Sequence, residues 1–303
     1  MAKQISMEVE GLKVPPPIDT RLSYSSSTLL SNCEQRYSYY KIEKVAEDKD
    51  AASRDKSHFN IGTSFHYILE ESLHEKPKDI IKDLDYCVQE IGLKEEDRAL
   101  VHAQVIKYLR LRKDSPLKVV GCEYAIKNPI IIGYIDAIEV DPTTGNWYIS
   151  DLKTAASFYD SKIAELPSNQ QLNLYCSFSK EIAEAYNLDP DKFMGARYLV
   201  ATKSKAKQKK SETYNEFVMR LADTSAIKAI FVTIPKEMMR IEETRAEIEA
   251  LHVRSLELRA GACPTRNYSY CNAFFSSCQY FSRCHGKENS EMMEDVKIVV
   301  ERL

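Results

Sequence analysis

The sequence predicts an α/β protein in which a central mixed β-sheet is flanked by helices. The chain has 303 residues, of which 44% are apolar, so one large domain with a buried core is feasible. Helical patterns come first, three neighbouring β-type runs follow, and a helix, a strand and a helix complete the order. This order predicts helices packed on a sheet within a single domain, residues 1–303.

The first third of the chain is predicted to be helical after an irregular lead-in. Residues 1–22 form this lead-in, because the prolines at 15–17 exclude a helix. The serines at 25–27 offer N-caps for an amphipathic helix that carries Cys33 on its buried side. The polar segment 47–57 is predicted to be a loop. Further helices are predicted at about residues 62–76, 78–91 and 95–113.

A β-hairpin is predicted in the middle of the chain. The segment 141–146 reads DPTTGN, which is turn chemistry. The hairpin brings Asp136 alongside Asp151, and Lys153 shares a strand face with Asp151 because strand side chains alternate. The three β-type runs are residues 118–126, 128–140 and 146–154.

Two carboxylates and an ammonium group therefore converge on one point of this hairpin. Neighbouring carboxylates repel each other, and a divalent cation relieves that repulsion. A lysine beside them can hold or polarise a water, so the group suits metal-assisted attack on a phosphodiester. The alternative is a solvent-facing hairpin whose charges point outward. The choice depends on which other residues join the site.

Three residues outside the hairpin are candidates for the same site. His66 lies on a predicted helix, and a neutral imidazole suits a catalytic divalent cation. A lone histidine is otherwise a core or surface residue. Gln171 and Tyr175 share a face of a helix predicted at 169–186. They could position a water or a phosphate, or form an ordinary polar face with a half-buried aromatic ring.

The remaining elements complete the sheet and its helical cover. A strand is predicted at residues 196–202, and the lysine-rich run 203–210 follows it. The segment FVMRLAD, residues 217–223, and the long run 223–259 predict a last strand and a long helix. The charged final stretch, residues 288–303, is predicted to be a short helix.

Cysteines cluster near the C-terminus. Cys271, Cys278 and Cys284 are separated by gaps of six and five residues that are rich in aromatic side chains. Three thiolates need a fourth ligand, which either Cys33 or Cys263 could supply. Soft sulfur ligands select an iron–sulfur cluster or zinc, and the closely spaced cysteine pairs usual for zinc are absent from the sequence.

Charge and hydropathy exclude several classes of protein. The net charge of −3 provides no global basic field, so nucleic acid would need a local patch. Lys203, Lys205 and Lys207 are the candidates, with a solvated loop as the alternative. The chain has no apolar run of about 18 residues for a membrane span and no secretory signal. Its eight cysteines then fit a reducing compartment, so we expect a cytoplasmic protein.

Motifs in five parts of the chain, in order, resemble the PD-(D/E)xK nuclease superfamily. They are most similar to its RecB-type exonuclease branch, which includes the Cas-four nuclease and many phage exonucleases. The resemblance rests on SYSSSTLLSNCEQRYSYY, GTSFHYILEE, the metal motifs GYIDAIE and SDLKT, QLNLY, and the closing cysteine cluster. It covers most of the chain. Two details differ: Ile135 rather than proline precedes Asp136, and the family's first cysteine gap is usually two residues, not six.

The resemblance implies a restriction-endonuclease-like core and a role for each motif residue. Lys153 would activate the attacking water. Gln171 and Tyr175 would hold the scissile phosphate or its neighbour. The ligands of Mg²⁺ or Mn²⁺ would be His66, Asp136, Asp151 and the backbone carbonyl of Leu152.

The resemblance also implies a [4Fe–4S] cluster, with Zn²⁺ as a less typical substitute, joining residues 23–45 to residues 261–285. Such a cluster would be a structural crosslink between the two segments, here called the buckle, rather than an electron carrier. It would place Arg36 over the site, beside a passage for single-stranded DNA. Its ligands would be Cys33, Cys271, Cys278 and Cys284, with Cys263 a rival of Cys33.

We therefore predict a Mg²⁺- or Mn²⁺-dependent DNA exonuclease acting in recombination, repair or phage DNA processing, in a bacterial or phage-infected cell. Its partner would be DNA with a free end or in single-stranded form, and no membrane. A homo-oligomer or a recombination or repair partner protein stays open. The alternative is a catalytically inactive nuclease-fold protein that binds DNA or serves as a scaffold subunit. The complete Asp…Asp-x-Lys set speaks against it.

Overall fold

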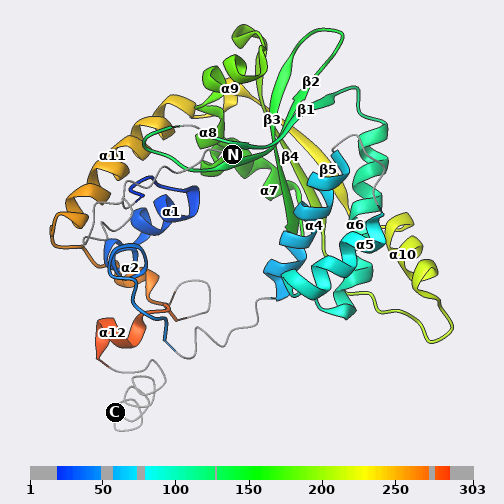
Figure 1. The fold of residues 1–303 in the computed structure, drawn as a ribbon, viewed down its shortest axis with the longest axis horizontal. Coiled ribbons are helices and arrows are strands. Elements are labelled where there is room, and N and C mark those ends of the chain that lie inside the picture. The colour runs from blue at the N-terminus through cyan, green and yellow to red at the C-terminus, as the bar shows by residue number, and fades with distance from the viewer. Residues whose placement is uncertain (1–18, 49–56, 74–78, 127, 273–276, 287–303) are drawn as a thin grey trace, which may run out of the picture.

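A five-stranded β-sheet runs through the centre of the protein in the order β1–β2–β3–β4–β5 (Figure 1). The pairs β1–β2, β2–β3 and β4–β5 are antiparallel and the pair β3–β4 is parallel, which confirms the predicted mixed sheet. The computed structural model describes residues 19–48, 57–73, 79–126, 128–272 and 277–286. The strands are β1 Lys118–Ala125, β2 Tyr134–Val140, β3 Trp147–Ala155, β4 Phe193–Thr202 and β5 Ala229–Pro235.

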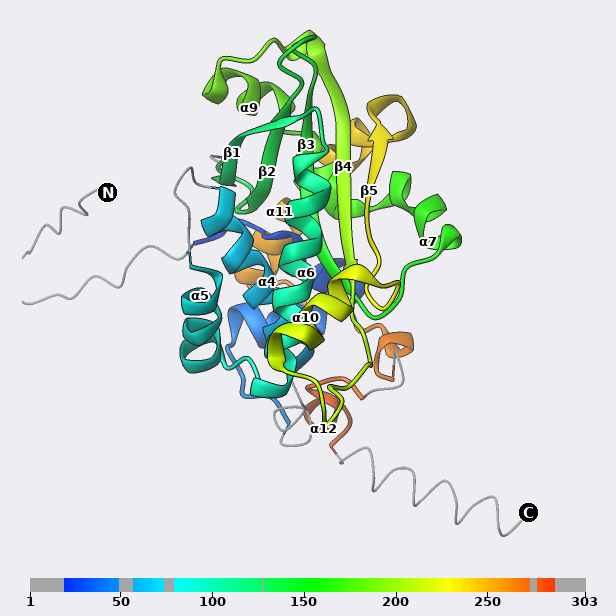
Figure 2. The same ribbon diagram turned by 90° about the vertical axis from the view of Figure 1, so that its right-hand side faces the viewer.

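Helices cover both faces of the sheet, as predicted, with α4, α6 and α10 in front of it and α11 behind it in Figure 2. In the first layer, Phe65 packs in one cluster with Leu152 and Leu199. Ile149 belongs to the cluster on the other face, because side chains alternate along β3. The first layer contains α4 Ser57–Leu73, α5 Ile80–Tyr86, the π-helical turn η2 Cys87–Ile91, α6 Glu95–Lys113 and α10 Tyr214–Asp223. The other α-helices between β3 and the C-terminal segment are α7 Asp160–Glu165, α8 Gln170–Cys176, α9 Ser179–Tyr186 and α11 Ile241–Arg259.

The described end of the lead-in pairs with the segment before β2. The backbone N–H of Leu22 donates to Ile130 O at 2.8 Å, and Leu22 O accepts from the N–H of Ile132 at 2.9 Å. Leu22 is fully buried. The strand predicted at 128–140 is therefore regular only from Tyr134, because the residues before it pair with the lead-in.

The opening helix is interrupted at Cys33, so the prediction of one continuous helix is wrong. α1 Tyr24–Asn32 ends where Cys33 takes an extended conformation, with φ −165° and ψ 109°, and α2 Glu34–Tyr37 and the π-helical turn η1 Ser38–Ile42 follow. The N-cap is Ser23, not one of the serines at 25–27, and it forms a capping box with Ser26. α1 packs against α11 through Leu30 and Leu258. Cys33 thus lies at a bend rather than on a buried helix face.

The segment predicted as the last strand, residues 217–223, is the helix α10. Thr213 begins this helix with a capping box, because its side chain accepts from Glu216 N and its own N–H donates to the Glu216 carboxylate. The last strand is β5, nearer the C-terminus. The buried side chains of α10 follow a helical spacing and are Phe217, Val218, Leu221 and Ala222.

Other boundaries shift without changing the layers. The helix predicted at 169–186 is divided into α8 and α9, and α4 begins at Ser57, earlier than predicted. The C-terminal segment contains the turn η6 Tyr268–Tyr270 and α12 Phe281–His285, whereas the helix predicted at 288–303 lies outside the described residues. Of the helices described, none is both long enough and apolar enough to span a bilayer.

Replacing Thr213 with Ala is expected to lower the free energy of unfolding by about 1 kcal/mol, because α10 loses its N-cap. Urea unfolding followed by circular dichroism measures this change. Ser211→Ala is the matched control, since Ser211 is exposed in the preceding turn and its loss should cost less than about 0.5 kcal/mol. Equal effects of the two substitutions would contradict the capping role.

Candidate active site and cysteine pocket

The β2–β3 hairpin sets two carboxylates opposite each other. Asp141 closes its turn, since the side chain accepts a backbone hydrogen bond at 2.8 Å. Ala137 pairs with Ser150 across the hairpin. One step further along the same register, Asp136 lies opposite Asp151, as the sequence predicts.

Hydrogen bonds hold these two carboxylates in different ways. Asp151 Oδ1 accepts from Lys153 Nζ at 2.7 Å. Asp136 Oδ2 accepts from the N–H of Leu152 at 2.6 Å, and Asp136 Oδ1 lies 3.4 Å from His66 Nδ1. The structure thus places the four predicted side chains in two contacting pairs, His66 with Asp136 and Lys153 with Asp151. Leu152 contributes its amide to this arrangement, and the contact predicted for its carbonyl stays a prediction.

Burial and charge act on these groups in opposite directions. Asp151 is 1% exposed, and its burial, only partly offset by Lys153, raises its pKa to about 6. Burial also opposes the charges on Asp136 and His66, but the contact between the two groups outweighs it. This contact lowers the pKa of Asp136 and raises the pKa of His66. Asp151 Oδ2 is buried without a hydrogen-bond partner. Such an oxygen is costly to leave unsatisfied, and a cation would satisfy it.

Glu123 completes the group and was missed in the sequence. It lies on β1 between two residues that pair with β2, which sets it opposite Asp136. One ligand atom from each of His66, Glu123 and Asp136 lies within 4.8 Å of the others. Burial, with the charges of Asp136 and Glu70, raises the pKa of Glu123 to about 7. Its φ of +46° is unusual for a residue with a side chain. The only signal in the sequence was one acidic residue within a β-type run.

α8 brings the predicted Gln171 and Tyr175 to the same region. Asn169 caps this helix by accepting a backbone hydrogen bond at 3.0 Å. Gln171 Nε2 donates to Tyr175 Oη at 3.0 Å, and a Cβ on Gly133 would lie 3.3 Å from the Tyr175 ring. Burial is the main cause of the raised pKa of Tyr175, and the charge of Asp151 adds to it. The phenol therefore stays protonated and can donate a hydrogen bond.

The match to known proteins spans all of these residues. A family model described as the PD-(D/E)XK nuclease superfamily matches residues 21–285. The chain belongs to the PD-(D/E)XK nuclease superfamily. A crystal structure from Eubacterium rectale, named "Putative exonuclease", has a similar fold with a TM-score of 0.53 and 12% identity, over 94% of each chain. No curated protein matches the chain in sequence. The predicted superfamily is confirmed, and its RecB-type branch stays a prediction.

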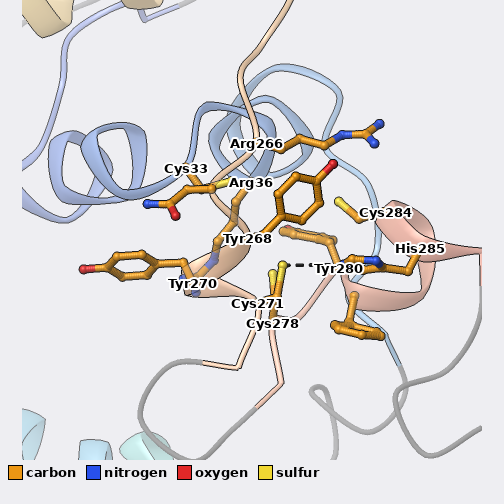
Figure 3. A pocket seen from close by; sticks show the side chains of 12 residues that line it. Cys33, Arg36, Arg266, Tyr268, Tyr270, Cys271, Cys278, Tyr280, Cys284 and His285 are labelled. Carbon is orange, nitrogen blue, oxygen red and sulfur yellow. Dashed lines mark hydrogen bonds between the residues drawn. The ribbon is translucent and has the colours of Figure 1, made fainter. Parts of the chain in front are cut away.

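Four cysteines from the two ends of this nuclease domain line one pocket (Figure 3). Cys263 is exposed, and its Sγ lies 3.9 Å from the carbonyl of the next residue. Burial raises the pKa of Cys271, and the thiol of Cys33 is among the groups that add to the rise. The fold therefore brings Cys33, and not Cys263, to the clustered cysteines. The four are Cys33, Cys271, Cys278 and Cys284.

Ion pairs and hydrogen bonds beside this pocket join the N-terminal segment 23–45 to α11 and to the segment 261–285. Arg254 donates to both carboxylate oxygens of Glu34 at 2.8 Å, and the N–H of Thr265 donates to Glu34 at 2.8 Å. These hydrogen bonds, led by that of Arg254, lower the pKa of Glu34 to about 2. Arg36 donates to Gln279 at 2.7 Å and lines the cysteine pocket. The DNA contact predicted for Arg36 stays a prediction.

The predicted lysines on the loop after β4 have unlike surroundings. Lys203 Nζ donates to His58 O at 2.8 Å. Lys205 and Lys207 line a cavity of about 610 Å³ whose lining also contains acidic residues. The negative charge of these acidic residues opposes phosphate binding in the cavity. DNA contacts by the lysines stay a prediction. The acidic residues are Glu95, Glu96 and Asp97.

Proposed function

We propose that this protein is a Mg²⁺- or Mn²⁺-dependent nuclease that degrades DNA from an end. One observation carries the proposal: Asp136 and His66 meet beside the Asp151–Lys153 pair, where Asp151 Oδ2 has no partner. Glu123 adds a further carboxylate. Crowded buried carboxylates of this kind are more stable with a divalent cation between them.

The donor set fits a hard divalent cation. Carboxylate oxygens with one imidazole suit Mg²⁺ and Mn²⁺. When bound, the cation would stabilise the negative charge that develops on the phosphate. The residues that would hold it are His66, Glu123, Asp136, Asp151 and the Leu152 carbonyl.

Lys153 and the Gln171–Tyr175 pair would act on water and substrate. Burial opposes the charge on Lys153, but Asp151 and Asp136 outweigh it and raise the pKa of the ammonium group. Lys153 would therefore orient a water for in-line attack as a charged donor, rather than take its proton. The Tyr175 phenol and the Gln171 amide would donate hydrogen bonds to the phosphate.

The exonuclease form of this activity is supported by the motif order of the RecB-type branch and by the fold shared with the Eubacterium rectale protein. Its setting would be recombination, repair or phage DNA processing. End-labelled linear DNA and closed circular DNA, each incubated with Mg²⁺ or Mn²⁺, test it. Loss of the linear DNA alone is the expected result. Cutting of the circle would point to an endonuclease, and cleavage of neither to a DNA-binding scaffold.

The cysteine pocket is proposed to hold a [4Fe–4S] cluster. Soft thiolate ligands select an iron–sulfur cluster or zinc. The similarity of the motif order to the RecB-type branch favours the iron–sulfur cluster. The cluster would join residues 23–45 to residues 261–285 and close a loop of about 240 residues, which makes it a structural buckle.

Metal binding is expected to weaken as the pH falls through about 7 and then about 6, the values to which burial raises the pKa of Glu123 and Asp151. Below each pKa the carboxyl is protonated and cannot bind the cation. At ordinary pKa values the carboxyls would be protonated only near about pH 4, and His66 alone would take up a proton above that pH. Calorimetric titration with Mn²⁺ measures the loss of binding. Glu123→Gln should weaken the upper step without removing it, because His66, whose pKa is also raised, takes up its proton in the same range and then cannot bind the cation. Constant affinity between these pH values would contradict the assignment.

A further inference from the structure

A groove continues the candidate active site along β3 and α8. It has a volume of about 630 Å³ and is lined in part by Ala155 and Gln170. Ala155 lies two residues beyond Lys153 on β3, roughly 7 Å along the strand. Gln170 directly precedes Gln171 on α8. A DNA strand that entered the site would therefore extend into this groove.

Three aromatic rings from distant parts of the chain line the groove: Tyr24 of α1, Phe158 after β3, and Tyr198 of β4. Each residue is half-buried, so part of each ring is accessible. The rings of Phe158 and Tyr198 have centroids 6.3 Å apart and planes inclined by 33°. Tyr198 is paired with Asp151 across β3 and β4. Tyr198 thus lies next to the candidate catalytic carboxylate, and Phe158 lies beside Tyr198.

The polar groups of the groove suit an uncharged ligand. Among the described residues that line it, Lys162 is the one cation, and its Nζ is already 2.7 Å from the carboxylate of Glu165. A phosphate would meet little positive charge here. A flat base can stack on the rings and hydrogen-bond through its edge. The hydroxyl and amide side chains that line the groove are Ser157, Ser168, Asn169 and Gln170. Asn169 Oδ1 already caps α8, so this residue can offer only its side-chain N–H groups.

We propose that this groove binds one unpaired base of the DNA strand, on a nucleotide next to the phosphate held at Asp151 and Lys153. The proposal rests on the proposed nuclease function, which supplies the position of the phosphate. A base within a duplex is already stacked on both faces and paired along its edge, so it cannot enter. The groove therefore selects single-stranded DNA or an unpaired end, without regard to sequence, because every base has a flat face.

Binding to a labelled oligothymidylate and to an abasic strand of the same length, with Ca²⁺ in place of Mg²⁺, tests the groove apart from turnover. Wild-type protein should bind the abasic strand on the order of tenfold more weakly. Phe158→Leu keeps an apolar side chain but removes the ring, and should lose this discrimination. Tyr198→Leu should reduce it, whereas Tyr198→Phe, which keeps the ring, should retain it. Fluorescence anisotropy measures the affinities and thermal unfolding checks the fold of each variant.

Tyr159→Leu is the matched control, because Tyr159 is 55% exposed and does not line the groove. It should discriminate between the strands as wild-type protein does. Equal binding of both strands by wild-type protein, or unchanged discrimination in folded Phe158→Leu and Tyr198→Leu, would overturn the base site. Cleavage by wild-type protein with Mn²⁺ is measured separately. A failure there, with base discrimination intact, would count against the nuclease function and not against the groove.

Discussion

Replacing Asp151 with Asn is expected to slow DNA cleavage on the order of a thousandfold without destabilising the metal-free protein. The carboxylate is 1% exposed and one of its oxygens has no partner. The amide keeps an acceptor for Lys153 and removes the charge that repels Asp136. Burial raises the pKa of Asp151 to about 6, so at neutral pH its ionised form opposes folding when no cation is bound. Loss of the ion pair with Lys153 acts in the opposite direction, so the melting temperature of the metal-free protein should change little.

Cleavage rates on end-labelled DNA and thermal unfolding with and without Mn²⁺ measure both parts of this result. Wild-type protein should gain about 2.7 kcal/mol of stability from Mn²⁺ at about a hundred times its Kd, and the Asp151→Asn variant should gain little. Asp141→Asn is the matched control, since asparagine can still close the hairpin turn. Undiminished DNA cleavage by the Asp151→Asn variant would contradict the proposed nuclease mechanism.

Cys284→Ser is expected to remove the proposed cluster and lower the free energy of unfolding by about 2–5 kcal/mol, the usual cost of losing a native crosslink. Cys284 lines the pocket with Cys33, so its loss opens the buckle between the two ends of the domain. Iron content, absorbance near about 400 nm and unfolding of anaerobically prepared protein measure the effect. The hydrogen bonds of Arg254 to Glu34 remain, so the domain should stay folded at low temperature.

Cys263→Ser is the control for this substitution. Cys263 is exposed and lies outside the pocket, so its replacement should leave iron content and stability unchanged. Loss of iron in this variant would make Cys263 a ligand in place of Cys33. A colourless wild-type protein with stoichiometric zinc would replace the iron–sulfur cluster with a zinc site.

Patterns among neighbouring residues were sufficient to predict the hairpin from the sequence. Side-chain alternation places Asp151 and Lys153 on one face of any strand that contains both, and the turn at 141–146 acts over neighbouring positions. The same approach was wrong for residues 217–223. A short amphipathic segment fits a strand or a helix, and the capping box begun by Thr213 decides for the helix.

The opening helix shows the second kind of error. Helical spacing continued through Cys33 in the sequence, but the backbone there is extended. Glu34, the next residue, is held by Arg254 of α11 and by Thr265. The chain bends where contacts with a distant segment begin. Helical periodicity reflects neighbouring residues only, so it does not predict such contacts.

By itself, the sequence determined the α/β class, the hairpin and the order of the candidate site residues, because alternation, turn chemistry and motif order are read from neighbouring positions. Only the tertiary structure decided that Glu123 joins His66 and Asp136, and that Cys33 rather than Cys263 meets the clustered cysteines. Those two outcomes depend on how α4 and β1 meet β2 and on how α1 packs against α11. Such contacts join segments far apart in the chain, and their geometry follows from packing of the whole core rather than from any local pattern.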